Sequence, residues 1–471
     1  METTEISESS VTWRSSHNGE VHGRLVRLAR HRVVFEVYGP SGLLRTSEVL
    51  SEFEIVLRER TIYSGRATVS SLVATELMEV CEASLNEGSW QDVDFTLALG
   101  RNGKMRAMFN SFIQDWQKWY RIQPEYKVII ADMQSFLTDL RFWADQLELG
   151  LRALPAEARA QTEDKLVAEL APPLIPCVNT LFEKFEAIAL SLEEDSRAAH
   201  RSYMRRQLHP LVLCAPFAHR TYEKPLGYAG DYEMVNMIVR NGFEGGSLFA
   251  KLLNTWFLRQ PPAEAHRNRI QYLKSRLEEE AARAARAGRR ARILNLGCGP
   301  AVEVQEFLKE SKLSDCLELT LLDFNDQTIQ YARTALEDIK KRFHRTTGLT
   351  FQKKSVLQVL KEAARATSPP QHEMVYCAGL FDYLNDRACK QLMDIFYDWT
   401  APGGLVATTN VEPANPMRNG MEHLLDWTLI YRTGAGMRTL APRQAQEDAV
   451  SVYSDPTGVN VLLEVRKFSN G

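Results

Sequence analysis

The segment that most constrains the fold of this chain is a short apolar strand that runs directly into a glycine turn. Residues 293–303 read Ile-Leu-Asn-Leu-Gly-Cys-Gly-Pro-Ala-Val-Glu. Gly297 and Gly299 allow the backbone to turn sharply and to approach a ligand without interference from a Cβ atom. A strand, a glycine loop and a helix that begins near Val302 predict the first part of an open α/β sheet, which binds ligands beyond the carboxyl ends of its strands.

A second strand strengthens this interpretation. Residues 317–322 are apolar and lead into Asp323, at the distance expected for the neighbouring strand of a Rossmann-like sheet. A carboxylate at this place can accept two hydrogen bonds from a ribose diol. Val302 occupies the position of the third glycine of G-x-G-x-x-G, which disfavours a dinucleotide site. The apolar runs 374–377 and 405–409 alternate with helical stretches, so we expect βαβ units around a mainly parallel sheet.

The chain is long enough for about three domains. In residues 1–100, the alternation of Val33, Phe35 and Val37 with other side chains predicts a small antiparallel β domain. Helical periodicity then dominates residues 101–205, as in the stripe from Phe109 to Trp116, and predicts a helical connector or bundle. We assign residues 206–471 to the α/β domain, with a lid segment at its start and a charged, solvated helix over residues 276–290.

Composition excludes several classes of function. The net charge is −3, with 57 basic and 60 acidic residues, so no overall field attracts nucleic acid or an anionic membrane. The sequence starts without signal-peptide features and contains no apolar run long enough to span a bilayer, so we expect a cytoplasmic protein. Its seven cysteines lack CxxC or Cys/His spacing, and we expect neither a disulfide framework nor a metal site.

The glycine loop, Asp323 and the sequence Leu-Leu-Asp-Phe-Asn over residues 321–325 together resemble class I S-adenosylmethionine-dependent methyltransferases. This resemblance implies S-adenosylmethionine as cofactor, with the glycine loop along its methionine part and Asp323 on its ribose. For Cys377, inert packing under the loop is the favoured interpretation. The residues that we place at the cofactor are Tyr222, Asn295, Gly297, Cys298, Gly299, Asp323, Phe324, Asn325, Ser355, Cys377, Ala378 and Gly379.

Three further segments, residues 219–234, 375–386 and 426–432, are similar to the bacterial family of 3-hydroxypalmitic acid methyl ester biosynthesis proteins. The similarity implies that a fatty acid carboxylate is esterified with the methyl group of the cofactor. One position departs from the family pattern: Glu412 stands where the pattern has histidine. This exchange alters charge and proton handling if the position faces the acceptor.

The acceptor determines whether a general base is needed. A carboxylate is ionised at neutral pH and needs none, whereas a hydroxyl or amine benefits from one. We therefore favour O-methylation of a small acceptor such as a hydroxy fatty acid. The alternatives are N-methylation of an amine or protein side chain, and a regulatory protein that senses cofactor or nucleotide without turnover. The candidate catalytic residues are Tyr228, Asp231, Asp382 and Glu412, with Glu233 and His423 as further candidates. For each one taken singly, a structural role as a cap, a core hydrogen bond or a surface group is favoured over catalysis.

The N-terminal β region resembles a divergent PilZ-like domain, a small barrel that in bacteria often senses cyclic di-GMP. Arg24, Arg27 and Arg30 lack the Arg-x-x-x-Arg spacing of functional members. Because arginine clusters are what a bis-phosphate ligand requires, we expect no cyclic di-GMP binding. A homodimerisation or partner module is the expected role of the N-terminal or helical region.

Overall fold

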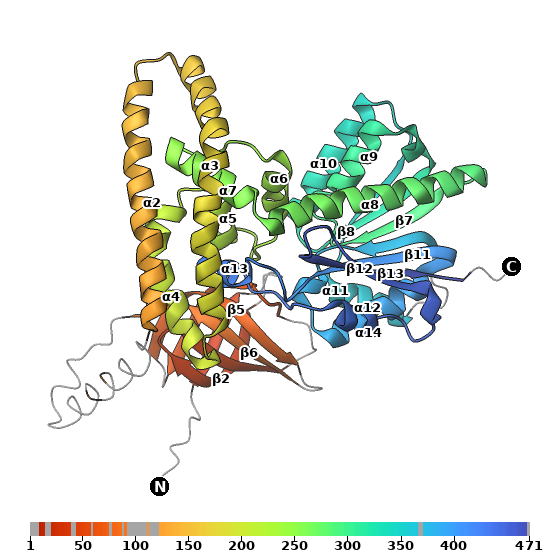
Figure 1. Ribbon diagram of the computed structural model, residues 1–471. Helices are drawn as coiled ribbons and strands as arrows, with labels where there is room; N and C mark the ends of the chain where they lie inside the picture. Colours follow the sequence, from red (N-terminus) through yellow and green to blue (C-terminus); the bar gives the residue numbers. More distant parts are fainter. Residues whose placement is uncertain are drawn as a thin grey trace, which may run out of the picture. The chain divides into compact units, whose positions relative to one another are not determined.

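The computed structural model describes residues 9–14, 20–38, 44–57, 60–74, 78–86, 89–91, 110, 113, 122–365 and 371–468 (Figure 1). The chain forms two compact units. The first comprises Met1–Ala229, Phe243–Trp256 and Met417–Thr428, and the second comprises Gly230–Gly242, Phe257–Pro416 and Leu429–Gly471. The predicted division at residues 100 and 205 stays a prediction, and the stripe from Phe109 to Trp116 falls almost entirely outside the described residues.

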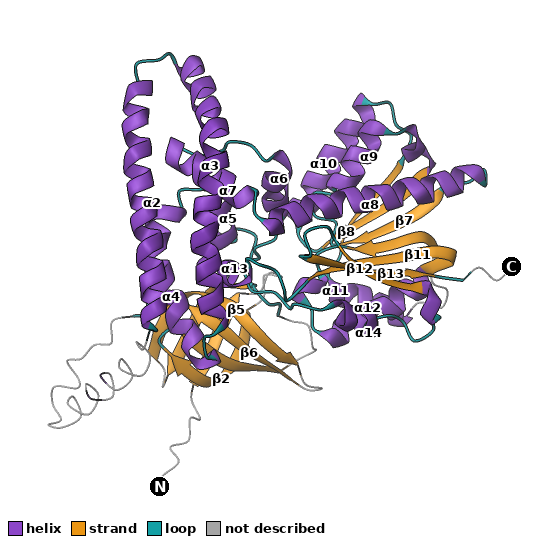
Figure 2. Cartoon of the chain, viewed as in Figure 1, coloured by secondary structure: helices purple, strands orange, loops and turns teal. Residues whose placement is uncertain are grey.

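The first unit begins with a closed antiparallel barrel (Figure 2). Its strands follow one another around the barrel as β1 (Ser9–Arg14), β2 (Glu20–Ala29), β3 (Arg32–Tyr38), β6 (Met78–Leu85), β5 (Arg60–Ala74) and β4 (Val49–Leu57). The predicted alternation is confirmed, because Val33, Phe35 and Val37 are all buried. The rings of Phe35 and Trp13 lie 5.3 Å apart, and aromatic side chains fill the barrel interior.

In the described part of the first unit, helices follow the barrel and confirm the predicted helical region. They are α2 (Pro124–Leu151), α3 (Ala156–Leu190), α4 (Glu194–Val212), α5 (Pro216–Glu223), most of α7 (Leu248–Leu258) and α13 (Arg418–Leu424). Ile129 and Met133 of α2 are buried on one face, as their spacing predicts. None of the helices within the described ranges combines the length and apolarity that crossing a bilayer requires.

The second unit is built on a mixed seven-stranded sheet. Across the sheet the strands are β12 (Val450–Ser454), β13 (Asn460–Arg466), β11 (Thr400–Val411), β10 (His372–Cys377), β7 (Ala291–Leu296), β8 (Leu317–Asp323) and β9 (Gly348–Lys353). The pairs from β11 to β9 are parallel, as expected. β13, however, is antiparallel to both β11 and β12, so the expectation of a mainly parallel sheet is correct for five strands and incomplete for the whole.

Helices cover both faces of this sheet (Figure 2). One face carries α8 (Pro261–Arg286), α9 (Val302–Glu310) and α10 (Asp326–Arg342), and the other carries α11 (Val356–Arg365), α12 (Asp386–Trp399) and α14 (Gly434–Thr439). Further helical elements are α6 (Tyr232–Arg240) and the 3₁₀ turns η3 (Lys312–Cys316), η4 (Phe381–Tyr383) and η5 (Glu447–Ala449). The predicted solvated helix over 276–290 corresponds to the last part of α8, which ends at Arg286. This part is not solvated all round, since Leu277 and Ala281 are buried against the sheet.

Candidate functional site

The strand order places the candidate site at the carboxyl edge of the sheet. From β7 the chain continues to β8 and β9 on one side, then crosses to β10 and β11 on the other. Such a reversal opens a crevice beyond the strand ends, where ligands of doubly wound sheets bind. Most of the predicted cofactor contacts lie in the loops that follow β7, β8, β9 and β10. Asn295, Asp323 and Cys377 lie at or near the ends of β7, β8 and β10 themselves, and Tyr222 lies in α5.

The glycine loop after β7 has the backbone conformation that its sequence predicts. Gly297 and Gly299 have φ angles of 73° and 53°, in the left-handed region that favours glycine. The N–H groups of Gly297 and Cys298 donate to the carbonyl oxygen of Leu322, at 2.8 and 3.0 Å. A Cβ atom built at Gly299 would have no neighbour within 4 Å, so there is open space beside this residue.

Asp323, at the end of β8, is joined to the glycine loop. Its Oδ2 accepts a hydrogen bond from Gly299 N–H at 3.2 Å, and its Oδ1 accepts one from Asn325 N–H at 3.0 Å. The residue is only 5% exposed. Both carboxylate oxygens therefore accept from backbone N–H groups, which orient the side chain beside the glycine loop.

A buried acid that the sequence did not reveal supports the loop. Glu303, in the first turn of α9, accepts hydrogen bonds through Oε1 from the Tyr376 hydroxyl at 2.7 Å and from Asn295 Nδ2 at 3.3 Å. Burial raises the pKa of Glu303. The available signal in the sequence was Tyr376 within the apolar run 374–377, since a buried phenol usually has a hydrogen-bond partner. Asn295 therefore links strand and helix beneath the loop.

Two predicted cofactor contacts also act as helix caps. Asn325 Oδ1 accepts from Thr328 N–H at 3.1 Å at the start of α10. Ser355 and Gln358 cap α11 reciprocally: Ser355 Oγ accepts from Gln358 N–H at 3.3 Å, and Gln358 Oε1 accepts from Ser355 N–H at 2.8 Å. These bonds explain both polar side chains locally. Contacts of Phe324, Asn325 and Ser355 with a cofactor stay predictions.

The end of β10 and the loop that follows it contain a buried thiol and a glycine with positive φ. Burial raises the pKa of Cys377, and likewise that of Cys298, so both thiols are protonated at neutral pH. This supports the inert-packing interpretation of Cys377. Gly379, which follows Ala378, has a φ of 85°, and its N–H donates to Thr409 Oγ1 of β11 at 3.1 Å.

Asp382 lies in η4, directly beyond this loop, and is buried. Its Oδ1 accepts from Val411 N–H at 2.7 Å, which ties η4 to the end of β11. Burial raises the pKa of Asp382 to about 6, against the opposing influence of Arg269. Arg432 secures the same junction and was missed by the sequence analysis: its guanidinium donates to the carbonyl oxygens of Phe381 and Leu384 and to Asn410 Oδ1.

Other catalytic candidates of the second unit also have structural partners. Glu412 Oε1 accepts from Gly434 N–H at 3.1 Å. Asp231 is the N-cap of α6 and accepts from Met234 N–H at 2.9 Å, while Glu233 forms an ion pair with Arg240 at 2.9 Å. Catalytic roles for these acids stay predictions.

Tyr222, Tyr228 and His423 belong to the first unit. The Tyr222 ring lies edge-on to His209 at 4.4 Å, and Tyr228 is half-buried in the turn after α5. His423 is on a helix, as predicted, but it is fully buried and not at the surface: its Nδ1 lies 2.9 Å from the Tyr126 hydroxyl.

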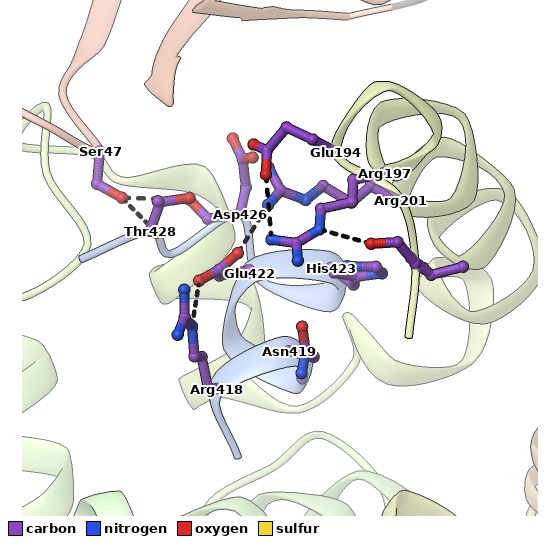
Figure 3. A network of polar contacts seen from close by, with 12 residues as sticks. Ser47, Glu194, Arg197, Arg201, Arg418, Asn419, Glu422, His423, Asp426 and Thr428 are labelled. Carbon is purple, nitrogen blue, oxygen red and sulfur yellow. Dashed lines mark hydrogen bonds and ion pairs between the residues drawn. The ribbon is translucent and has the colours of Figure 1, made fainter. Parts of the chain in front are cut away.

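The first unit also contains a buried ionic network around α13, which we call the α13 network (Figure 3). It consists of Glu186, Arg201, Arg205, Lys224, Glu422 and Asp426. Asp426 pairs with Arg205 at 2.7 Å and with Lys224 at 3.3 Å, while Glu422 pairs with Arg201 at 2.7 Å. Glu186 of α3 accepts N–H groups at the start of α13.

Electrostatics in this network are strong because its members are shielded from water. Burial alone would raise the pKa of Asp426, but Arg205 and Lys224 hold it well below its usual range. Burial lowers the pKa of Lys224 to about 8. Ser47 of the barrel joins the same region, since its Oγ accepts from Thr428 N–H at 2.8 Å. The barrel and the α13 segment are therefore parts of one folded unit.

Across the described parts of the chain, no group of three or more histidine, cysteine, aspartate or glutamate side chains is arranged to hold a metal ion. Fold and site together define an α/β domain with a glycine loop and a facing carboxylate at its topological switch point.

No protein-family model matches the sequence, and a search of the curated proteins found no similar one. Solved structures do show similarity. They include a protein from Bordetella parapertussis described as a possible exported protein, with 17% identity over 54% of this chain and 87% of that chain, at a TM-score of 0.40. The N-methyltransferase NodS from Bradyrhizobium japonicum, in complex with S-adenosyl-L-homocysteine, is 14% identical over 42% of this chain and 86% of its own, at 0.28. Human N-acetylserotonin methyltransferase with S-adenosylmethionine is 14% identical over 46% and 59%, also at 0.28.

Proposed function

We propose that the second unit binds S-adenosylmethionine at the carboxyl edge of its sheet and transfers the methyl group to a small acceptor. The observation that carries this proposal is the junction of Asp323 with the glycine loop. A carboxylate fixed by Gly299 N–H suits a ribose diol at the end of the second strand.

The residues present fit the cofactor. Gly297 and Gly299 provide two positions without a Cβ atom, with open space beside Gly299 for the methionine part. Asp323 would accept from the ribose hydroxyls, and the backbone at Ala378 and Gly379 would border the sulfonium. When bound, the cofactor supplies a methyl group that is already activated for in-line displacement, so the residues that orient the acceptor can contribute much of the rate.

For the acceptor we propose oxygen, in the carboxylate of a hydroxy fatty acid or a similar metabolite. Such an acceptor is ionised at neutral pH and needs no general base. Asp231, Asp382 and Glu412 each accept a backbone N–H, which gives each acid a structural role, and the proposed reaction requires none of them as a base. An amine acceptor would instead need a base that can take a proton.

For the first unit we propose a role in homodimerisation or partner binding, and not in binding cyclic di-GMP. The barrel interior is filled by Trp13, Phe35 and Phe53, which supports a structural core over an enclosed ligand site. Light scattering after size exclusion measures the assembly state. A cyclic di-GMP titration followed by calorimetry tests the second part, and saturable binding would contradict it.

The test of the cofactor proposal is calorimetric titration of the full chain with S-adenosylmethionine and S-adenosylhomocysteine, with NADH as the comparison ligand. We expect saturable binding of the first two and none of NADH. A labelled-methyl assay with hydroxy fatty acids, their alcohols and simple amines then identifies the acceptor class. If folded protein binds neither sulfur compound, the proposal is wrong; binding without transfer to any acceptor would favour a sensor.

A further inference from the structure

Two arginines on the same helix differ sharply in their hydrogen bonding. On α8, Arg267 donates to the carbonyl oxygens of Ile238 and Leu258, at 3.1 and 3.0 Å, and pairs with Glu264 at 2.6 Å. Arg269, two residues later, makes no hydrogen bond or ion pair with any residue that the structure describes. The guanidinium of Arg267 therefore holds the fold together, whereas the five donors of Arg269 remain available.

Arg269 lies at the candidate site. A Cβ atom built at Gly379 would be 3.1 Å from its Nη1 and 3.3 Å from its Nη2, so the guanidinium packs on the backbone just beyond β10. Any side chain at position 379 would push against it. Gly379, just beyond β10, thus serves two purposes: it adopts a φ of 85° and leaves room for a cation at the carboxyl edge.

The surroundings of Arg269 are charged but do not pair with it. Asp382 is the strongest electrostatic influence, followed by Tyr383, Glu303 and Cys377. Asp382 directs Oδ1 to Val411 N–H, and Glu303 directs Oε1 to Tyr376 and Asn295. Burial lowers the pKa of Arg269, although an arginine remains protonated at neutral pH. Arg269 is half-buried, so its guanidinium still reaches water, and the carboxylate of a ligand can take the place of that water.

We propose that Arg269 binds a carboxylate at the carboxyl edge of β10, either that of the cofactor's amino-acid part or that of the acceptor. The inference rests on the proposed function, because both carboxylates belong to its ligands. The planar guanidinium suits two parallel hydrogen bonds to a carboxylate, which a neutral amide cannot replace at equal strength.

The first experiment varies the ligand and uses the wild-type protein. Calorimetry on the wild-type chain compares S-adenosylhomocysteine with its carboxamide, and, at saturating S-adenosylhomocysteine, 3-hydroxydecanoate with 3-hydroxydecanamide. We expect one of the two acids to bind about ten- to a hundredfold more tightly than its amide, the range for a charge-assisted hydrogen bond. The arm in which the loss occurs identifies the source of the carboxylate.

Variants then assign the effect to Arg269. In Arg269→Gln we expect acid and amide to bind equally, while Arg269→Lys retains the charge without the fork and recovers part of the preference. Arg286→Gln is the matched control, because Arg286 is exposed on the same helix. If Arg269→Gln keeps the full preference for the acid, the proposal is wrong, and equal binding of acid and amide to wild type in both arms overturns it without any variant.

Failure of the proposed function would look different. A wild-type chain that does not bind S-adenosylhomocysteine at all contradicts the cofactor assignment. The acceptor arm is then run without it, and an undiminished preference for 3-hydroxydecanoate still supports the carboxylate site. Absence of that preference overturns it.

Discussion

The carboxyl edge of the sheet and the α13 network organise polar groups in opposite ways. At the edge, Asp323 is oriented by two backbone N–H groups, and two of the nearby turns have glycine at positive φ. In the α13 network, charged side chains are paired with one another away from water, as in Arg205 with Asp426. In the first arrangement a carboxylate is held by backbone groups beside the glycine loop, whereas in the second opposite charges pair with one another.

The difference predicts whether a substitution in each region changes the stability of the fold or the affinity for a ligand. Removing one partner from a buried ion pair leaves an uncompensated charge and destabilises the fold. Removing a carboxylate that is held by backbone groups at an open edge mainly affects what binds there. We therefore expect substitutions in the network to change stability and substitutions at the edge to change affinity.

The largest effect is expected at Asp426. Asp426→Asn removes the charge and retains a residue that tolerates its positive φ of 54°, so the backbone is not the cause of any loss. With Lys224 and Arg205 left uncompensated, we expect the free energy of unfolding to fall by about 3 kcal/mol at neutral pH. Urea unfolding measures the loss, and hydrogen exchange should locate it in α4 and α13.

The pH dependence of the stability that Asp426 contributes, and a control variant in an exposed ion pair, test this prediction further. The pKa of Asp426 is depressed in the folded state, so its contribution is present above the unfolded value of about 4 and is lost as pH falls below it. Asp145→Asn, in an exposed pair with Arg141, should cost no more than about 0.5 kcal/mol. Unchanged exchange in α4 and α13 of Asp426→Asn would remove the charge network as the source of stability.

The corresponding change at the edge is Asp323→Ala. We expect the affinity for S-adenosylhomocysteine to fall by about a hundredfold, equivalent to roughly 2–3 kcal/mol, because charge-assisted bonds to two ribose hydroxyls are lost. Calorimetry measures it, with Asp338→Ala on the exposed side of α10 as control. Full affinity in a folded Asp323→Ala protein would show that this carboxylate has no part in binding.

Asp382, at the same edge of the sheet, is expected to destabilise the folded state when its carboxyl group is ionised. Its folded pKa of about 6 lies above the unfolded value of about 4, so the folded state binds more protons between these values and stability falls as pH rises from 4 to 6. Asp382→Asn should abolish this slope, making the variant relatively more stable at pH 7 than at pH 4 by about 2 kcal/mol. Urea unfolding at both pH values measures it; parallel profiles for both proteins would contradict the prediction.

Sequence reasoning succeeded where the determinants are local. The loop at Gly297 and Gly299, the end of β8 at Asp323 and the start of α9 at Val302 all lie where their spacing predicts. The antiparallel entry of β13 was missed, because an apolar strand pattern does not encode direction. Cofactor binding itself stays a proposal.

Contacts between distant segments could not be predicted. Arg205 and Asp426 are 221 residues apart, and nothing in the segment 426–432 indicates Arg205 as the partner of Asp426. His423 illustrates the same limit: its sequence suits an exposed helix, but residues 417–428 fold among helices of the first unit and bury it. Polar side chains become buried where tertiary partners satisfy them, and a single sequence does not reveal those partners.

The smallest expected effect separates capping from ligand contact at Ser355. Ser355→Ala removes the hydroxyl that accepts Gln358 N–H, so we expect about 1 kcal/mol of lost stability. A role in capping alone would leave the affinity for S-adenosylhomocysteine unchanged. Asn385→Ala is the matched control, because Asn385 caps α12 in the same way without being a predicted cofactor contact. Should Ser355→Ala weaken binding while Asn385→Ala does not, the hydroxyl also touches the ligand, and the edge of β9 belongs to the binding site.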